Sequence, residues 1–322
     1  MNKKILVIGG AGYIGSHVQK KLLEDGFNVV VFDNLSSGDK INVLAGAQFV
    51  EGDILNEEEL DKVMSLGIDA VVHLAAKKAV GESMEKPEIY AKNNICGSIN
   101  ILNAMVKNGV KYIVFSSSAA VYGMPEYVPI DEKHKISPIN YYGYTKRAIE
   151  ENLEWFDKLG KIKFISLRYF NAVGYAKDKS IRGKERNPQN LMPIIMEAAT
   201  GKRDGFSIFG NDYETEDGTC IRDYIHVSDL ATAHCQSIKK LFSDDCSYTL
   251  NLGTGLGTSV KEIVDATEKV IGKKLKYSYA PRRAGDPAKL TANANMAQEV
   301  LGWKPQFVEI EDIISTVWNL EI

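Results

Sequence analysis

Residues 5–33 read ILVIGGAGYIGSHVQKKLLEDGFNVVVFD and contain the pattern that decides the fold. The apolar run Ile5–Ile8 predicts a buried strand, Gly12–Asp25 has the apolar spacing of a helix, and Asn28–Asp33 predicts the next strand. A glycine-rich turn separates the first strand from the helix. This order is typical of the first βαβ unit of a doubly wound, Rossmann-type parallel sheet.

The glycines of this turn fit two overlapping patterns. Gly10, Gly12 and Gly15 give G-x-G-x-x-G, and Gly9, Gly12 and Gly15 give G-x-x-G-x-x-G. Both describe a tight turn whose bare backbone lets a pyrophosphate approach the N-terminus of the helix. Asp33 ends the second strand, where its carboxylate would hydrogen-bond ribose hydroxyls and repel a 2′-phosphate. The unit therefore predicts bound NAD rather than NADP; the alternative is a structural glycine turn in an α/β protein without a nucleotide.

The first half of the chain continues to alternate strands and helices. Apolar runs buried on both faces and separated by helices predict a parallel sheet that is covered on both sides. Strands are predicted at Gln48–Asp53, Ile68–Ala75, Tyr112–Ser117 and Lys163–Phe170, and helices at Glu57–Ser65, Glu88–Lys107 and Tyr142–Lys158.

The pattern changes after Asn171. Residues 172–190 are rich in Gly, Lys, Arg, Asp and Ser and predict a long functional loop. Helices are then predicted at Leu191–Thr200, Val227–Leu241, Val260–Ile271 and Ile310–Leu320, and short strands at Ser207–Phe209, Tyr248–Leu252 and Leu275–Tyr279. We expect a strand to end at His226 and the chain to return there to the first domain. The expected division is an NAD-binding domain of residues 1–171 plus about 226–253, and a smaller, discontinuous C-terminal substrate domain of residues 172–225 and 254–322.

The composition excludes several classes of protein. The chain has 322 residues, of which 44% are hydrophobic and 25% charged, so it is neither disordered nor of low complexity. A net charge of -3 gives no global basic field for nucleic acid or an anionic membrane. No run reaches the roughly 18 apolar residues that a membrane span needs. Because Cys96, Cys220, Cys235 and Cys246 form no CxxC pattern, we expect no disulfide framework, no metal site and a cytoplasmic location.

Tyr142, Lys146 and Ser118 are the candidates for proton transfer. Tyr142 and Lys146 lie four residues apart at the start of a predicted helix, so their side chains share one face. Ser118 follows the strand at Tyr112–Ser117, at the carboxyl edge of the sheet. A tyrosine with a pKa of about 10 becomes a base near pH 7 only if its phenolate gains about 4 kcal/mol of stabilisation, part of which a neighbouring ammonium supplies. The alternatives are a core aromatic and a surface lysine, and Tyr175–Lys179 has the same spacing in the loop.

With these residues in view, the chain resembles the extended short-chain dehydrogenase/reductase superfamily and, within it, the UDP-glucose 4-epimerases, also called UDP-galactose 4-epimerases. The combination of TEDGT with RDYIHV in residues 215–227 is the most specific part of the resemblance. Matching stretches run almost from end to end: Gly9–Ser16, Asp33–Leu35, Val50–Asp53, Lys78–Ser83, Phe115–Gly123, Leu167–Asn171, Asn190–Pro193, Ile208–Asp212, Thr215–Val227 and Ala280–Asp286.

The resemblance implies a mechanism. NAD stays bound through turnover, and a tyrosine removes the proton of the sugar 4-hydroxyl while hydride moves from C4 to the nicotinamide. The 4-keto sugar then swings over, and hydride returns to its other face. On this chain Tyr142 is the base and then the acid, Ser118 is its hydroxyl partner, and Lys146 is the cation that lowers the pKa of the tyrosine and holds the nicotinamide ribose.

The resemblance also assigns cofactor positions. Ser36, Ser37 and Gly38 would hold the adenosine half, and Lys78 has the alternative of a surface lysine. Asp53 contacts the cofactor, caps the helix that follows it, or does both. The full set is Gly9, Gly12, Tyr13, Ile14, Gly15, Asp33, Asn34, Leu35, Ser36, Ser37, Gly38, Asp53, Ile54, Leu74, Ala75, Ala76, Lys78, Asn93, Ser116, Tyr142, Lys146 and Phe170.

The substrate positions implied by the resemblance lie mostly in the second half. Arg222 and Arg283 would grip the diphosphate of a UDP-sugar through forked hydrogen bonds, and Asp286 suits the ribose hydroxyls. Ser118 and Asn171 face the sugar, and Leu290 lines its pocket near C2 or is a core residue. The uridine positions are Asn190, Leu191, Ser207, Ile208 and Phe209. A homodimer through the helices near Glu88–Lys107 and Tyr142–Lys158 is also implied.

Other functions share parts of this pattern. A nucleotide-sugar 4,6-dehydratase needs an acidic pair beside the catalytic Ser, and Ala119 and Ala120 stand there instead. An epimerase for UDP-glucuronate or for N-acetyl sugars stays open. A non-catalytic, dinucleotide-sensing regulator would keep the glycine turn but would not need Tyr142, Lys146 and Ser118 together.

Overall fold

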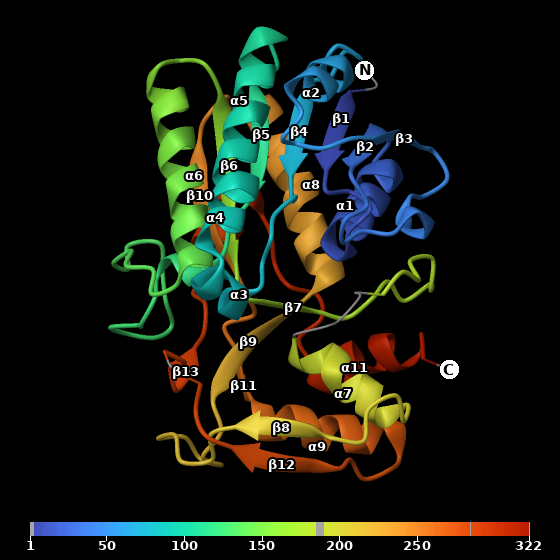
Figure 1. Ribbon diagram of the computed structural model, residues 1–322, viewed down its shortest axis with the longest axis vertical. Helices are drawn as coiled ribbons and strands as arrows, with labels where there is room; N and C mark the ends of the chain where they lie inside the picture. The colour runs from blue at the N-terminus through green and yellow to red at the C-terminus, as the bar shows by residue number, and fades with distance from the viewer. Residues whose placement is uncertain (1–2, 185–189, 284, 322) are drawn as a thin grey trace.

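A computed structural model describes residues 3–184, 190–283 and 285–321. Its largest element is a seven-stranded parallel sheet with the strand order β10-β6-β5-β4-β1-β2-β3. The arrows of β1 and β4 in Figure 1 point toward the C-terminal part of the chain. The strands are β1 (Lys4–Ile8), β2 (Asn28–Asp33), β3 (Ala47–Glu51), β4 (Ala70–His73), β5 (Tyr112–Ser116), β6 (Lys163–Tyr169) and β10 (Tyr248–Leu252).

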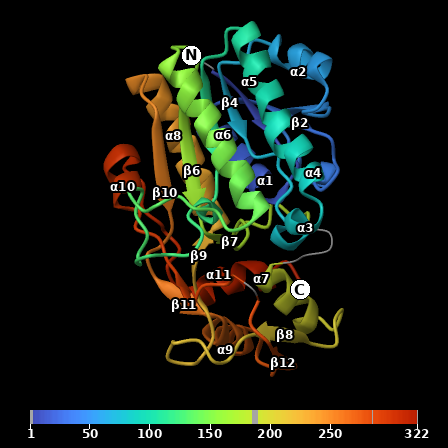
Figure 2. The same cartoon turned by 60° about the vertical axis from the view of Figure 1, so that its left-hand side comes forward.

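Helices cover both faces of this sheet. On one face α1 (Tyr13–Glu24) and α8 (Val227–Asp244) pack with the strands into one apolar core. On the other face a second core holds α2 (Glu57–Met64), α5 (Gly97–Lys107) and α6 (Tyr141–Lys158), of which α5 and α6 lie in front of the strands in Figure 2. The predicted Rossmann-type sheet is therefore confirmed.

The strand order places a ligand crevice beside β1. The chain runs outward from β1 to β2 and β3 on one side, and through β4, β5 and β6 on the other. Such a reversal opens a crevice at the carboxyl ends of the central strands. The turn after β1 and residues 74–76 after β4 both lie at this edge.

The remaining part of the chain packs below this edge (Figure 1). Strands β7 (Asn171–Val173), β9 (Ile221–His226), β11 (Gly257–Ser259) and β13 (Lys289–Leu290) form a second sheet, and β8 (Phe206–Phe209) pairs with β12 (Tyr277–Ala280). Helices α7 (Leu191–Ala199), α9 (Val260–Ile271) and α11 (Ile310–Trp318) share an apolar core with β8. The division of the chain into two domains stays a prediction.

Several predicted elements differ from the structure. The helix expected at Glu88–Lys107 is α4 (Pro87–Tyr90), a π-helical segment η2 (Ala91–Cys96) and α5. The wide turn brings Asn94 inward, where its buried amide accepts from the backbone N–H of Lys77 and donates to the carbonyl of Lys77. The strand expected from Leu275 begins at Tyr277, because Leu275 packs in the apolar core.

Short or polar elements account for the other differences. The helices α3 (Val80–Glu85) and α10 (Asn295–Leu301) and the single turns η1 (Lys40–Asn42) and η3 (Ala119–Val121) are too short to show a helical period. The predicted loop of residues 172–190 begins inside β7, and its residues 185–189 lie outside the described part of the chain. Across the described residues, no helix combines the length and the apolar character that crossing a membrane requires.

Candidate active site

The turn between β1 and α1 accepts only glycine at two positions. Gly9 has a φ of 81°, in the left-handed region. A Cβ on Gly15 would lie 2.2 Å from the carbonyl oxygen of Gly9 and 2.7 Å from the Cα of Gly10. Gly12 precedes α1 as its N-cap residue and offers no side-chain cap, so the first backbone N–H groups of the helix are left for a ligand or for solvent. The backbone thus forms a cradle that a pyrophosphate fits.

Asp33 is built into this turn. Its carboxylate accepts hydrogen bonds from the backbone N–H of Ala11 at 3.0 Å and of Leu35 at 2.8 Å. Burial raises the pKa of the Asp33 carboxyl, and these two N–H groups oppose the rise. The acid predicted to hold a ribose therefore lies directly beside the glycine turn.

Asp53 does not cap the helix that follows it. Asn56 caps α2 by accepting from two backbone N–H groups of the first turn. Asp53 instead accepts from the N–H of Leu55 at 2.8 Å and from the side-chain amide of Asn34 at 2.9 Å. The cap alternative is therefore wrong, and Asp53 and Asn34 meet at the outer side of the crevice.

The other predicted cofactor residues that follow β2, β3 and β4 lie near the same edge. Gly38 packs so closely that a Cβ would lie 2.8 Å from the carbonyl carbon of Ala11. The side chain of Ile54 is buried in the apolar core, so that residue offers only its backbone. Among the rest, the half-buried residues are Leu74, Ala75 and Ala76, and the exposed ones are Ser36, Ser37 and Lys78.

Asn93 belongs to the wide turn of η2. Its side-chain amide donates to Asn94 at 3.0 Å. Asn94 in turn accepts from the backbone N–H of Lys77, so it holds the loop that follows residues 74–76. The predicted cofactor position at Asn93 is thus linked to the crevice through its neighbour.

Tyr142 and Lys146 lie in the first two turns of α6, beside the end of β5. Asn140 caps this helix by accepting from the N–H of Gly143. Lys146 is 3% exposed, and its Nζ donates to the carbonyl of Ser116 at 2.7 Å. The same nitrogen lies 5.8 Å from the centre of the Tyr142 ring. The structure therefore brings together the pair and the serine strand that the sequence singled out.

The electrostatics of this pair favour the neutral forms in the chain alone. Burial lowers the pKa of Lys146 to about 7, and the Glu150 carboxylate opposes that fall. Burial raises the pKa of Tyr142, and a hydrogen bond with Ser118 opposes the rise. A phenolate at Tyr142 consequently needs more positive charge than Lys146 alone provides. An oxidised nicotinamide ring carries such a charge.

The predicted diphosphate and ribose residues also meet. Arg222 on β9 is buried and donates through Nη2 to Asp286 at 2.5 Å. The guanidinium of Arg283 lies 4.0 Å from the centre of the Phe209 ring. The backbone N–H of Asp286 donates to the carbonyl of Arg283 at 3.2 Å, so the two pairs are neighbours.

The uridine residues are only partly brought to these pairs. Along β8, Ser207 and Phe209 are exposed, but Ile208 is 1% exposed and packs in the apolar core. Ile208 can therefore meet a uridine only through its backbone, and its assignment to the substrate stays a prediction. Asn190 precedes α7 and makes no side-chain cap, and Leu191 is half-buried against the same core.

Leu290 lies between the two halves of the site. It pairs with Arg222 across β13 and β9 and is half-buried. Its side chain packs against an apolar cluster that includes Ala119 and Phe170, the neighbours of Ser118 and Asn171. Asn171 itself is exposed at the start of β7. This placement supports both interpretations of Leu290, as a pocket residue and as a core residue.

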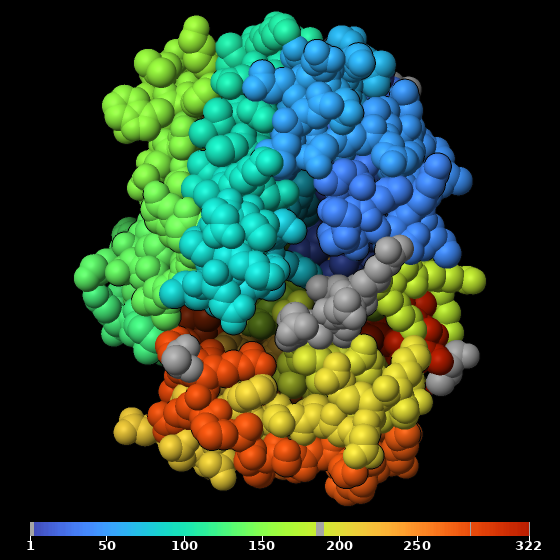
Figure 3. Space-filling view, in the orientation of Figure 1, coloured from blue at the N-terminus to red at the C-terminus, as the bar shows by residue number. Residues whose placement is uncertain are grey.

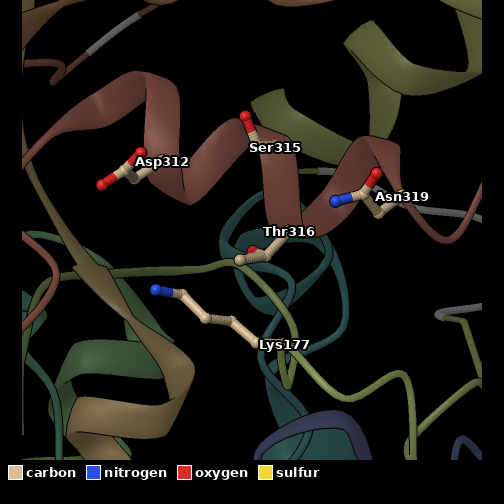
Figure 4. Close-up of a pocket in the computed structure, with 5 residues that line it drawn as sticks. All are labelled: Lys177, Asp312, Ser315, Thr316 and Asn319. Carbon is tan, nitrogen blue, oxygen red and sulfur yellow. The ribbon is translucent and has the colours of Figure 1, made fainter.

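The surface has a hollow near the predicted site residues and a pocket away from them. Figure 3 shows a hollow between the blue N-terminal elements and the cyan segment of α3 and α4. A separate pocket of about 240 Å³ lies between α11 and the loop after β7 (Figure 4). It is lined by Lys177, Asp312, Ser315, Thr316 and Asn319, none of which is among the predicted cofactor or substrate residues. We place the candidate active site at the glycine turn, Tyr142 and Lys146 rather than at this pocket, because the predicted site residues lie there.

Residues without an obvious motif also support the site. Glu150 lies one helical turn after Lys146 and is fully buried. The spacing of four residues after Lys146 is a signal that could have found Glu150. No local signal indicates the role of Asn94, because it depends on the π-helical turn.

Comparisons with known proteins agree with this arrangement. Residues 5–253 match the family described as the NAD dependent epimerase/dehydratase family. A protein of Streptococcus mutans named UDP-glucose 4-epimerase is 46% identical over 98% of this chain and 95% of its own. The crystal structure of UDP-glucose 4-epimerase from Brucella ovis in complex with NAD is 42% identical, with a TM-score of 0.95 over 98% of this chain and 97% of that one. A Stenotrophomonas maltophila structure with bound NAD and formylated UDP-arabinopyranose is 40% identical, with a TM-score of 0.96 over 99% and 98% of the two chains.

Proposed function

The chain belongs to the NAD dependent epimerase/dehydratase family and, within it, to the UDP-glucose 4-epimerases, and from this premise we propose that it interconverts UDP-galactose and UDP-glucose with Tyr142 as acid and base. It is an NAD-dependent enzyme that epimerises UDP-sugars at C4. The observation that carries the finer proposal is the meeting of Tyr142, Lys146 and the strand that leads to Ser118, at the edge that also holds the glycine turn. Galactose metabolism is the pathway this activity serves.

The residues of the crevice fit NAD. The turn at Gly9 and Gly15 has no room for a side chain, so it offers a bare backbone of the kind that binds a pyrophosphate. Asp33 offers carboxylate oxygens for ribose hydroxyls beside it. Bound NAD supplies the hydride acceptor and, in its oxidised form, a positive ring.

The protein residues divide the remaining work. Ser118 orients the 4-hydroxyl, and Tyr142 removes its proton and later returns one to the 4-keto oxygen. Lys146, fixed on the carbonyl of Ser116, favours the phenolate. Inversion requires the sugar to turn over while the nucleotide stays bound, so Arg222 and Arg283 anchor the diphosphate.

Turnover of UDP-galactose separates this function from its rivals. We expect the purified chain to convert UDP-galactose to UDP-glucose and to release NAD, identified by mass spectrometry, when it is denatured. A dinucleotide-sensing regulator releases NAD without converting the sugar. A dehydratase yields a product lighter by one water. UDP-glucuronate and the N-acetyl sugars are tested in parallel.

We expect Asp33 to enforce NAD over NADP. Asp33→Ala removes the acceptor for a ribose hydroxyl and for the N–H groups of Ala11 and Leu35. A lost hydrogen bond to a charged group corresponds to about a 10- to 100-fold weaker Kd for NAD. Asp33→Asn removes the charge but keeps an acceptor, so it should relax the discrimination against NADP with a smaller loss for NAD. Titration of the cofactor-free chain with NAD and with NADP measures the two Kd values. Undiminished NAD binding by Asp33→Ala contradicts the assignment of Asp33 to the ribose.

We expect Leu290 to favour unsubstituted hexoses. Leu290 offers an acetamide no hydrogen bond, and an unpaired buried amide costs about 1–3 kcal/mol, or roughly 5- to 150-fold in kcat/KM. UDP-glucose and UDP-galactose should therefore be turned over faster than their N-acetyl counterparts. Leu290→Ser should lower the ratio of kcat/KM on the unsubstituted sugars to kcat/KM on the N-acetyl sugars, and Leu290→Tyr should raise this ratio. Leu256→Ser, at an exposed leucine, is the control. Equal efficiency on both sugar pairs, or a ratio that neither variant moves, contradicts the prediction.

We also propose a cytoplasmic homodimer formed through α5 and α6. Large apolar side chains are exposed on and just after these helices, namely Val106, Tyr144, Trp155 and Leu159. Exposed apolar side chains of this size on the two helices support a protein partner at this surface. Trp155→Glu should halve the mass measured by light scattering, whereas Leu256→Glu should leave it unchanged. A parent chain that is monomeric at micromolar concentration contradicts the dimer.

A further inference from the structure

A buried ion pair lies directly behind the proton-transfer residues. Glu150 on α6 is 0% exposed, and Arg168 on β6 is 3% exposed. Arg168 donates through Nε to Glu150 Oε1 at 2.8 Å and through Nη2 to Glu150 Oε2 at 2.7 Å. The two planar groups therefore meet in the forked geometry that fixes both side chains in direction as well as in distance.

This pair holds the turn of Ser118 on both sides. Ser117 donates through its hydroxyl to Glu150 Oε1 at 2.7 Å. Arg168 Nη1 donates to the hydroxyl of Tyr122 at 3.1 Å. Residues 117 and 122 are thus tied to one rigid pair, and Ser118 lies between them in the chain.

The network also reaches the helix of Tyr142 and the edge strand. Glu150 lies one helical turn after Lys146, whose Nζ is bound to the carbonyl of Ser116. The hydroxyl of Tyr122 donates to Asn251 Oδ1 on β10 at 2.6 Å. All three proton-transfer residues are therefore located relative to each other through α6, β5 and β6, with the ion pair as the common point.

A contribution to stability alone does not account for this arrangement. Removing two charges from water costs several kcal/mol per ion, and apolar side chains of similar volume often stabilise a fold equally well. Glu150 and Arg168 are too deeply buried to meet a ligand in the crevice. Besides a longer contact of 3.4 Å between Arg147 and Glu150, their hydrogen bonds run to Ser117, directly before Ser118, and to Tyr122, four residues after it. An action through Ser118 therefore fits the geometry.

We propose that Glu150 and Arg168 are positioning residues, which fix the Ser118 turn against the helix of Tyr142 and Lys146 for proton transfer. This inference rests on the proposed function of Tyr142 and Ser118. A misplacement of about 1 Å between reacting groups lowers a rate by about 100-fold. Loss of the pair should accordingly lower kcat while substrate and NAD binding persist.

The first test replaces the pair by apolar residues in Glu150→Leu/Arg168→Met. We expect the double variant to fold and to keep its bound NAD, to change KM for UDP-galactose less than about 3-fold, and to lose about 10- to 100-fold in kcat. If the ion pair only stabilised the fold, a folded double variant with the Tm of the parent would also have the kcat of the parent. That result would overturn the proposal. Glu197→Leu/Arg203→Met removes another Arg–Glu pair, on the outer end of α7, and should leave kcat unchanged.

The second test keeps the ion pair and removes its hydrogen bonds to Ser117 and Tyr122. It therefore tests the positioning role even if the double variant does not fold. Ser117→Ala and Tyr122→Phe each remove one hydroxyl, and together they should lower kcat by about 10-fold with a parental KM. A parental kcat in the combined variant overturns the proposal. A parent chain without activity on UDP-galactose overturns the proposed function as well, whereas an active parent with unaffected variants overturns this inference alone.

Discussion

Tyr142→Phe is expected to lower turnover of UDP-galactose by about 10²- to 10⁴-fold while the protein stays folded with NAD bound. The substitution removes the ionisable hydroxyl and leaves the ring over which Lys146 lies. The backbone N–H of Tyr142 still donates to Ser83, so the start of α6 keeps its anchor. Turnover is followed by the formation of UDP-glucose, and bound NAD is quantified after denaturation.

The chain offers a matched control for this experiment. Tyr175 begins the second Y-x-x-x-K sequence, Tyr175–Lys179, which lies in the loop after β7 rather than on α6. Tyr175→Phe removes the same atom from the same local pattern and should leave kcat near that of the parent. Near-normal turnover of Tyr142→Phe, or an equal loss in Tyr175→Phe, would remove Tyr142 from the proton-transfer role.

Gly15→Ala is expected to abolish retention of NAD and to destabilise the fold by about 1–3 kcal/mol or more. Its Cβ would lie 2.2 Å from the Gly9 carbonyl oxygen, which is backbone and cannot rotate away. The turn and the N-terminus of α1 must therefore separate, and the pyrophosphate cradle is lost. Bound NAD and the Tm of the purified variant measure the two effects.

Gly81→Ala is the control for an added methyl group. Gly81 lies in α3 with an ordinary φ, and a Cβ added to it would meet no atom within 4 Å, so alanine should leave the Tm unchanged or slightly higher. If Gly15→Ala retains NAD as the parent does, the turn does not hold the pyrophosphate.

The features that could be predicted from the sequence are those that depend on residues close together in the chain. The strands at Asn28–Asp33 and Tyr248–Leu252 and the helix at Val260–Ile271 have the predicted bounds, because a few neighbouring residues determine each of them. The glycine turn and the pairing of Tyr142 with Lys146 on one helical face are equally local.

The features that escaped prediction depend on contacts between distant segments. Ile208 faces the core because β8 packs its alternate side chains against α7 and α9, and the strand alone does not show which side is buried. Asn94 turns inward only because η2 is wound more widely than an α-helix. Arg168 looks like a charged interruption of an apolar strand until Glu150 is placed beside it.

The position of β10 has a consequence for the order in which the protein forms during synthesis. The chain leaves the main sheet at Tyr169, at the end of β6, and returns to pair with that strand only at Tyr248–Leu252. Until residue 252 has emerged from the ribosome, β6 is an open edge whose backbone N–H and C=O groups can pair with another nascent chain. A nascent chain arrested before β10 should therefore be prone to aggregation. The seventh strand should join the sheet late, after the segments between β6 and β10 have been made.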